Sequence, residues 1–119
     1  MIAEARISPE ILSRAAAVIR CLGHPLRLRL LEALETGEKT VTELQDYAGV
    51  SQPMVSQHLM VLKAHGVVDL RRAGPFAFYW IVEPKVKAIL ACIRARELRE
   101  SFVAETGRGT GGPPSVPGV

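Results

Sequence analysis

Residues 42–66, TELQDYAGVSQPMVSQHLMVLKAHG, decide the fold. Thr42 is placed to cap a short helix, and Leu44 and Ala48 supply the inner face of that helix. Gly49 follows at the position where a left-handed residue commonly ends a helix. The first half of this stretch therefore predicts a short helix that stops at a tight turn.

The second half of the stretch predicts a longer helix beginning at about Gln52. Ser51 can accept a hydrogen bond from a free amide of the first turn, and Pro53 has no amide proton to leave unpaired there. Apolar residues recur at helical spacing on one side, namely Val55, Leu59 and Leu62. The polar residues fall largely on other faces and are Gln52, Ser56, Gln57, His58 and Lys63.

Two helices joined in this way are typical of a helix-turn-helix, which places the N-terminal part of its second helix in the major groove of DNA. Glutamine and serine can read base edges there. An ordinary amphipathic surface helix would have an equally polar face, so this stretch alone leaves both interpretations open. The candidate DNA-contacting residues in it are Ser51, Gln52, Pro53, Ser56, Gln57, His58 and Lys63.

The next segment, residues 67–82, reads VVDLRRAGPFAFYWIV. It is rich in β-branched and aromatic residues and is interrupted by Ala73-Gly74-Pro75, which predicts two antiparallel strands joined by a turn. Arg71 and Arg72 precede the turn, where a hairpin beside a recognition helix can contact phosphates or the minor groove. The alternative for these arginines is a solvated edge protected by charge. Together the helices and the hairpin favour a winged helix-turn-helix and a nucleic-acid partner.

The rest of the chain completes a mainly α fold with a small β-hairpin. Helices are expected at about residues 9–22, 25–35 and 84–102 from the spacing of their apolar residues. We therefore expect one domain over residues 1–105. Residues 106–119 hold five of the ten glycines and three of the eight prolines, which predicts a disordered tail.

Composition sets further limits on the class of protein. The chain has 119 residues, of which 48% are apolar, enough for a core without indicating a membrane protein. No apolar run approaches the roughly 20 residues that cross a bilayer, and no signal peptide is apparent, so we expect a cytoplasmic protein. The net charge is only +3, but residues 51–80 carry Lys63, Arg71 and Arg72 against the single acid Asp69. This local excess of positive charge suits binding to the negatively charged phosphates of DNA.

Residues 22–81 resemble the ArsR/SmtB family of bacterial winged-helix repressors. The resemblance rests on LGHPLRLRLLEAL, on SQPMVSQHL from Ser51 to Leu59, and on the strand that holds Tyr79. It implies a homodimer that pairs its first and last helices, binds a palindromic double-stranded operator, and leaves it when an inducer binds or a thiol changes state. An apolar stripe over residues 86–93 suits such a last helix.

The resemblance also implies which metal sites to look for, and the sequence lacks their ligands. Family members that sense thiophilic ions often carry two cysteines where this chain reads Thr40-Val41-Thr42-Glu43-Leu44. Zinc, nickel and cobalt sensors use histidines of the last helix, and residues 83–105 contain none. We therefore expect no metal and no cofactor.

Cys21 and Cys92 admit two interpretations. Two cysteines in a cytoplasmic protein usually are small buried apolar side chains. The sharper hypothesis is a thiol sensor, because these residues lie on the first and last helices, which the resemblance brings to one interface. A reversible modification there would change the separation of the recognition helices.

Two other function classes compete with a repressor. An enzyme is not expected, because the chain lacks a glycine-rich phosphate loop and a metal pair, and Ser51 or Ser56 with His58 is better explained by capping and DNA contact. The second alternative is a winged-helix protein-interaction module without specific DNA binding. Salt-dependent binding to duplex DNA distinguishes it from a repressor.

Overall fold

The computed structural model describes residues 5–106, with side chains described as far as residue 97. The chain divides into two units, Met1–Val86 and Lys87–Val119. Within the described residues, no helix is both long and apolar enough to cross a membrane.

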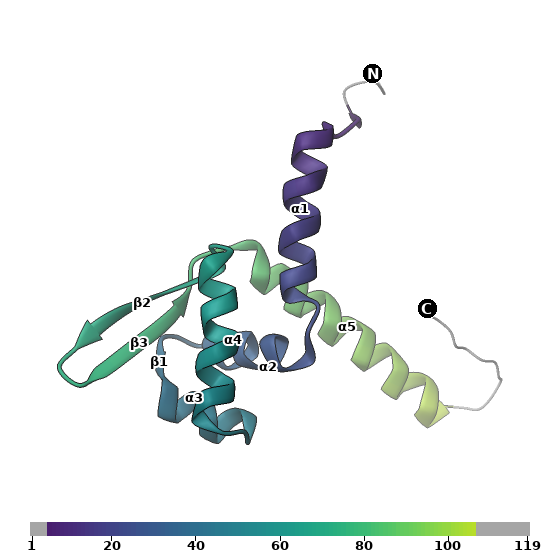
Figure 1. Ribbon diagram of the computed structural model, residues 1–119. Coiled ribbons are helices and arrows are strands. Elements are labelled where there is room, and N and C mark those ends of the chain that lie inside the picture. The colour runs from purple at the N-terminus through teal and green to yellow at the C-terminus, as the bar shows by residue number, and fades with distance from the viewer. Residues whose placement is uncertain (1–4, 107–119) are drawn as a thin grey trace. The chain divides into compact units, whose positions relative to one another are not determined.

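Four helices of the first unit confirm the predicted order of elements (Figure 1). Proline stands in the first turn of three of them, where its missing amide proton costs nothing. Ser8 caps the first, since its Oγ accepts the amide of Ile11 at 3.3 Å, and His24 caps the second, since its Nδ1 accepts the amide of Leu26 at 3.1 Å. The helices are α1 (Pro9–Leu22), α2 (Pro25–Leu34), α3 (Val41–Ala48) and α4 (Gln52–Ala64).

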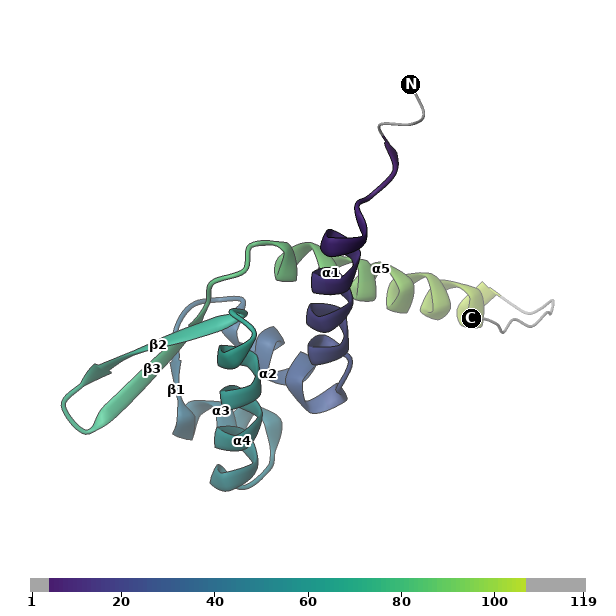
Figure 2. The same ribbon diagram turned by 45° about the horizontal axis from the view of Figure 1, so that its top comes forward.

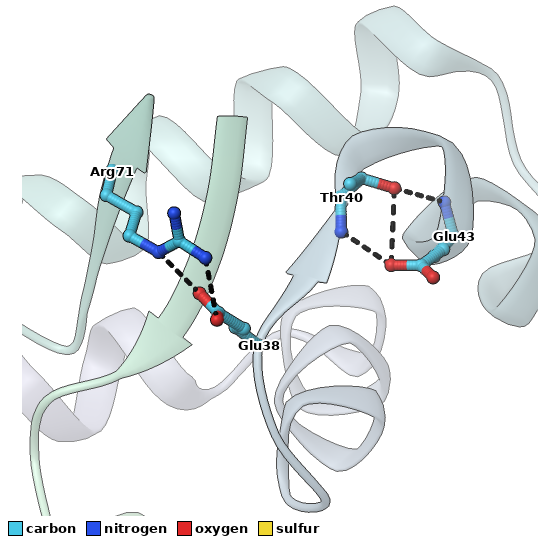
Figure 3. Close-up of polar contacts among 4 residues, drawn as sticks. All are labelled: Glu38, Thr40, Glu43 and Arg71. Atoms are coloured by element: carbon cyan, nitrogen blue, oxygen red, sulfur yellow. Dashed lines mark hydrogen bonds and ion pairs between the residues drawn. The ribbon is translucent and has the colours of Figure 1, made fainter. Parts of the chain in front are cut away.

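The cap of α3 differs from the prediction. Thr40, and not Thr42, is the capping residue (Figure 3). Thr40 Oγ1 accepts the amide of Glu43 at 3.2 Å, and Glu43 Oε1 accepts the amide of Thr40 at 2.8 Å. This reciprocal pair satisfies two amides that the helix leaves free, so the helix begins earlier than at Thr42.

The predicted hairpin is present and belongs to a three-stranded antiparallel sheet. β2 (Val68–Ala73) pairs with β3 (Phe76–Ile81), and Gly74 takes the positive φ of 62° that the two-residue turn requires. The third strand, β1 (Lys39–Thr40), was not predicted. It pairs with β3 on the other edge, so the strand order is β1-β3-β2.

Helices α2, α3 and α4 pack on one another and on the base of the sheet. Figures 1 and 2 both show the β2-β3 hairpin extending beyond these helices. The fully buried side chains include residues from all three helices, and they confirm the predicted inner positions of Leu44, Val55, Leu59 and Leu62. They are Leu30, Leu31, Leu44, Val55, Leu59, Leu62, Val67, Val68 and Val86.

α1 has a different environment, because only its last turn is buried, through Cys21 and Leu22. In both views the rest of α1 rises away from α2–α4 (Figures 1 and 2). The apolar residues Ile11, Leu12 and Ile19 are exposed. Most of the apolar side of α1 is therefore exposed, and only its last turn, with Leu22, is buried.

The last helix, α5 (Lys85–Thr106), is longer than the predicted 84–102. Its residues from Lys87 onward belong to the second unit. Val86 and Leu90 are buried, whereas Ile89 and Ile93 are exposed. Of the predicted tail, Thr106 ends this helix, and residues 107–119 lie outside the described part of the chain.

Candidate nucleic-acid interface

The turn between α3 and α4 has the predicted geometry. Gly49 ends α3 in the left-handed conformation with φ of 71°, and its amide donates to the carbonyl of Gln45 at 2.7 Å. Ser51 then caps α4, because its Oγ accepts the amide of Met54 at 3.4 Å. Only residues 49–51 separate the helices, so α3 and α4 form a helix-turn-helix in which the turn fixes the direction of α4.

Most of the candidate residues on α4 face outward. Ser51, Gln52, Pro53, Gln57 and Lys63 are exposed, and Ser56 is half-buried. The Gln52 amide donates to Ser56 Oγ at 3.0 Å, and Lys63 Nζ lies 3.9 Å from a carboxylate oxygen of Asp69. The N-terminal part of α4 therefore presents a polar surface.

His58 does not belong to that surface. We predicted it among the polar, DNA-contacting residues, but its side chain is only 8% exposed. The reason is visible in its spacing, since it follows Val55 by three residues and precedes Leu62 by four. This position lies on the buried stripe of α4, and a helical projection of the sequence would have found it.

Buried His58 is held by a polar cluster at the start of α2. Arg27 Nε donates to His58 Nδ1 at 3.1 Å, and another nitrogen of Arg27 donates to the carbonyl of Cys21 at 2.9 Å. The His24 ring lies against the His58 ring, with 4.4 Å between centroids. Burial lowers the pKa of His58, and the neighbouring His24 and Arg27 lower it further. The cluster ties α1, α2 and α4 together.

The two arginines of the hairpin differ in their surroundings. Arg71 lies 4.7 Å from the centre of the Phe78 ring and reaches across β3 to Glu38, with its Nε and a terminal nitrogen 3.1 and 3.0 Å from the carboxylate (Figure 3). This pairing lowers the pKa of Glu38 and raises that of Arg71. Arg72 is exposed and has no ion pair within the described residues. Arg71 therefore braces the hairpin, and Arg72 leaves its charge open to solvent.

The two cysteines also differ. Cys21 is buried, with its thiol 3.9 Å from the carbonyl of Val61, and burial raises its pKa although Arg27 opposes the shift. Cys92 is exposed. Both are free thiols. Among the described residues, no cluster of three or more His, Cys, Asp or Glu side chains could hold a metal ion.

A helix-turn-helix, an outward polar helix and a hairpin with a solvent-exposed arginine define the class of winged helix-turn-helix DNA-binding proteins. Residues 24–69 match the family model described as bacterial regulatory protein, arsR family. An uncharacterized HTH-type transcriptional regulator of Methanocaldococcus jannaschii is 37% identical over 81 residues, which cover 67% of this chain and 91% of that protein. The chain belongs to the ArsR family of DNA-binding transcriptional regulators, and it is therefore not an enzyme.

Two further comparisons agree with this assignment. The HTH-type transcriptional repressor SmtB of Mycobacterium tuberculosis is 40% identical over 74 residues, which cover 62% of this chain. The matched part spans only 55% of that repressor. The homodimeric winged helix-turn-helix DNA-binding domain Mb0332 of Mycobacterium bovis superposes with a TM-score of 0.68 at 25% identity, covering 89% of this chain and 99% of that domain. The winged-helix fold and the resemblance predicted from the sequence are confirmed.

Proposed function

We propose that the protein is a cytoplasmic homodimeric repressor that binds a palindromic operator. The observation that carries the proposal is the exposed polar start of α4, where Gln52 and Gln57 face outward, together with exposed Arg72 on the hairpin that follows α4. Glutamine at this end of a recognition helix suits base edges in the major groove, and an exposed arginine on the wing suits phosphate. The similar protein SmtB is a repressor, which supports the same direction of regulation.

Dimerisation is proposed from two separate apolar faces. α1 exposes Ile11, Leu12 and Ile19, and α5 exposes Ile89 and Ile93. Several large apolar residues exposed on one helix are typical of a surface that a second chain covers. The similar domain Mb0332 is homodimeric. A twofold dimer would place two recognition helices about one DNA turn apart, which is why we propose a palindromic operator.

Arg72→Ala is expected to weaken binding to every duplex by roughly fivefold to tenfold, because it removes a charged interaction with phosphate that carries no sequence information. The slope of log affinity against log salt should become shallower by about 0.9 for each phosphate that the variant no longer neutralises. Fluorescence anisotropy over a salt series measures both. Arg6→Ala is the control, since it removes an equal charge from an exposed residue that precedes α1. Equal decreases in both variants would leave the wing without a role, and a wild-type protein with no salt-dependent DNA binding would favour the protein-interaction module.

We further propose that an inducer or a thiol modification releases the protein from DNA, and we assign the thiol step to Cys92. A mild oxidant or a persulfide donor should lower operator affinity of the wild type and of Cys21→Ser, because exposed Cys92 is open to reagent whereas burial keeps Cys21 protonated and shielded. Cys92→Ser should lose the response. Anisotropy measured before and after treatment checks this. A wild-type affinity that does not change would remove both cysteines from regulation and leave a non-thiol inducer.

A further inference from the structure

α4 carries an exposed apolar side chain at the end that faces DNA in the proposed function. Met54 is 41% exposed, and its amide is held by Ser51 Oγ at 3.4 Å, which places it in the first turn of the helix. It lies off the buried stripe that contains Val55 and Leu59. A single exposed apolar residue is common on protein surfaces, so its neighbours decide what it can do.

The decisive neighbour is Gln57, which lies three residues further on the same side of the helix. Gln57 is exposed and has no hydrogen-bond partner among the side chains described. Gln52 differs, because its amide already donates to Ser56 Oγ at 3.0 Å. The side-chain amide of Gln57 is therefore available for a hydrogen bond with DNA, and Met54 is the apolar group beside it.

Together these two side chains have the chemical groups needed to recognise an A·T base pair. A glutamine amide matches N6 and N7 of adenine, and an apolar side chain matches the C5 methyl group that thymine presents in the same groove. Residues three apart are separated by about 4.5 Å along a helix, a distance comparable to the roughly 3.4 Å between stacked base pairs. The two side chains can therefore meet the same or adjacent A·T pairs.

We propose that Met54 determines specificity by packing on the methyl group of an operator thymine, next to an adenine read by Gln57. This inference rests on the proposed function and names the sequence element that α4 selects. The flexible thioether chain of methionine adapts to such a contact without fixed geometry. The recognised class of site is thus a major groove that contains a thymine methyl group in each half-site.

The test begins with duplexes selected by the wild type from a random-sequence library. Each thymine of the selected duplex is then replaced in turn by deoxyuridine, which keeps the pairing edge and lacks only the methyl group. At one thymine per half-site, wild-type affinity should fall by about fourfold, the value expected for one methyl group removed from an apolar contact. Met54→Ala should bind the thymine and uracil duplexes equally, and Met54→Leu should keep the discrimination.

Met60→Ala is the matched control. Met60 is a methionine of the same helix and is 69% exposed, but it lies about two turns from the first residue of α4. Its variant should discriminate thymine from uracil as the wild type does. Wild-type binding that ignores every replacement, or a Met54→Ala variant that remains as sensitive as the wild type, would overturn the inference while leaving a DNA-binding repressor. A wild type that selects no sequence would overturn both.

Discussion

Replacing Arg27 with alanine is expected to lower the free energy of unfolding by about 2–3 kcal/mol. The substitution removes the donor to His58 Nδ1 at 3.1 Å and the donor to the Cys21 carbonyl at 2.9 Å. Both acceptors lie in or beside the interior, so each would lose a charge-assisted hydrogen bond without free access to water. Urea unfolding followed by circular dichroism measures the change.

Arg29→Ala is the control for this variant. Arg29 belongs to the same helix but is exposed, and it forms a surface ion pair with Glu32 three residues away. Exposed pairs of this kind contribute little to stability, so this variant should unfold nearly as the wild type does. If both arginine variants unfold at the same urea concentration, the Arg27–His58 hydrogen bond does not stabilise the fold.

Local patterns predicted the elements of the first unit with little error. Pro9, Pro25 and Pro53 mark helix starts, Gly49 marks the end of α3, and leucine spacing identifies the inner faces. These signals act within one or two turns of the chain, so they can be interpreted without knowing the tertiary structure. The hairpin could be predicted for the same reason, because its turn joins strands that are adjacent in sequence.

Interactions between distant segments were not predicted. β1 has only two residues, Lys39 and Thr40, and it exists because β3 offers them a free edge. Glu38 and Arg71 are 33 residues apart, and nothing in either segment indicates their pairing. At the candidate site this matters directly, since the sequence treats Arg71 and Arg72 as equivalent, whereas the structure pairs only one of them. Arg71 and Arg72 can be distinguished only when the alignment of the strands in the sheet is known.

Protein stability is expected to fall as the pH drops below about 6.5, and His58 should cause part of this decrease. Its pKa in the folded protein lies below the ordinary histidine value of 6.5, first because of burial and then because of His24 and Arg27. Between the folded and unfolded values, the unfolded chain binds a proton that the folded chain does not. Acid therefore favours unfolding, by at most about 1.4 kcal/mol per pH unit for one group.

The geometry explains why the folded protein resists this proton. His58 Nδ1 accepts a hydrogen bond from Arg27, so a proton on that atom would break the hydrogen bond and place two cations together in the interior. His58→Asn keeps an acceptor oxygen near the same position but cannot titrate. We expect its stability to be lower than that of the wild type yet to change less as the pH falls below about 7, as urea midpoints would measure.

His65→Asn is the control variant, because it tests whether the loss of any histidine changes the pH dependence of stability as the loss of His58 does. His65 is exposed at the C-terminal cap of α4, where its ring nitrogen Nδ1 lies 3.0 Å from the carbonyl of Val61, so its replacement removes one histidine without disturbing the hydrogen bond between Arg27 and His58. Glu38 does not interfere, because Arg71 lowers the pKa of its carboxyl from 4.5 and it becomes neutral only at still lower pH. A His58→Asn variant that keeps the wild-type slope would mean that another group takes up the proton. Since His58 belongs to α4, a confirmed slope would also mean that acid acts on the helix proposed to read DNA.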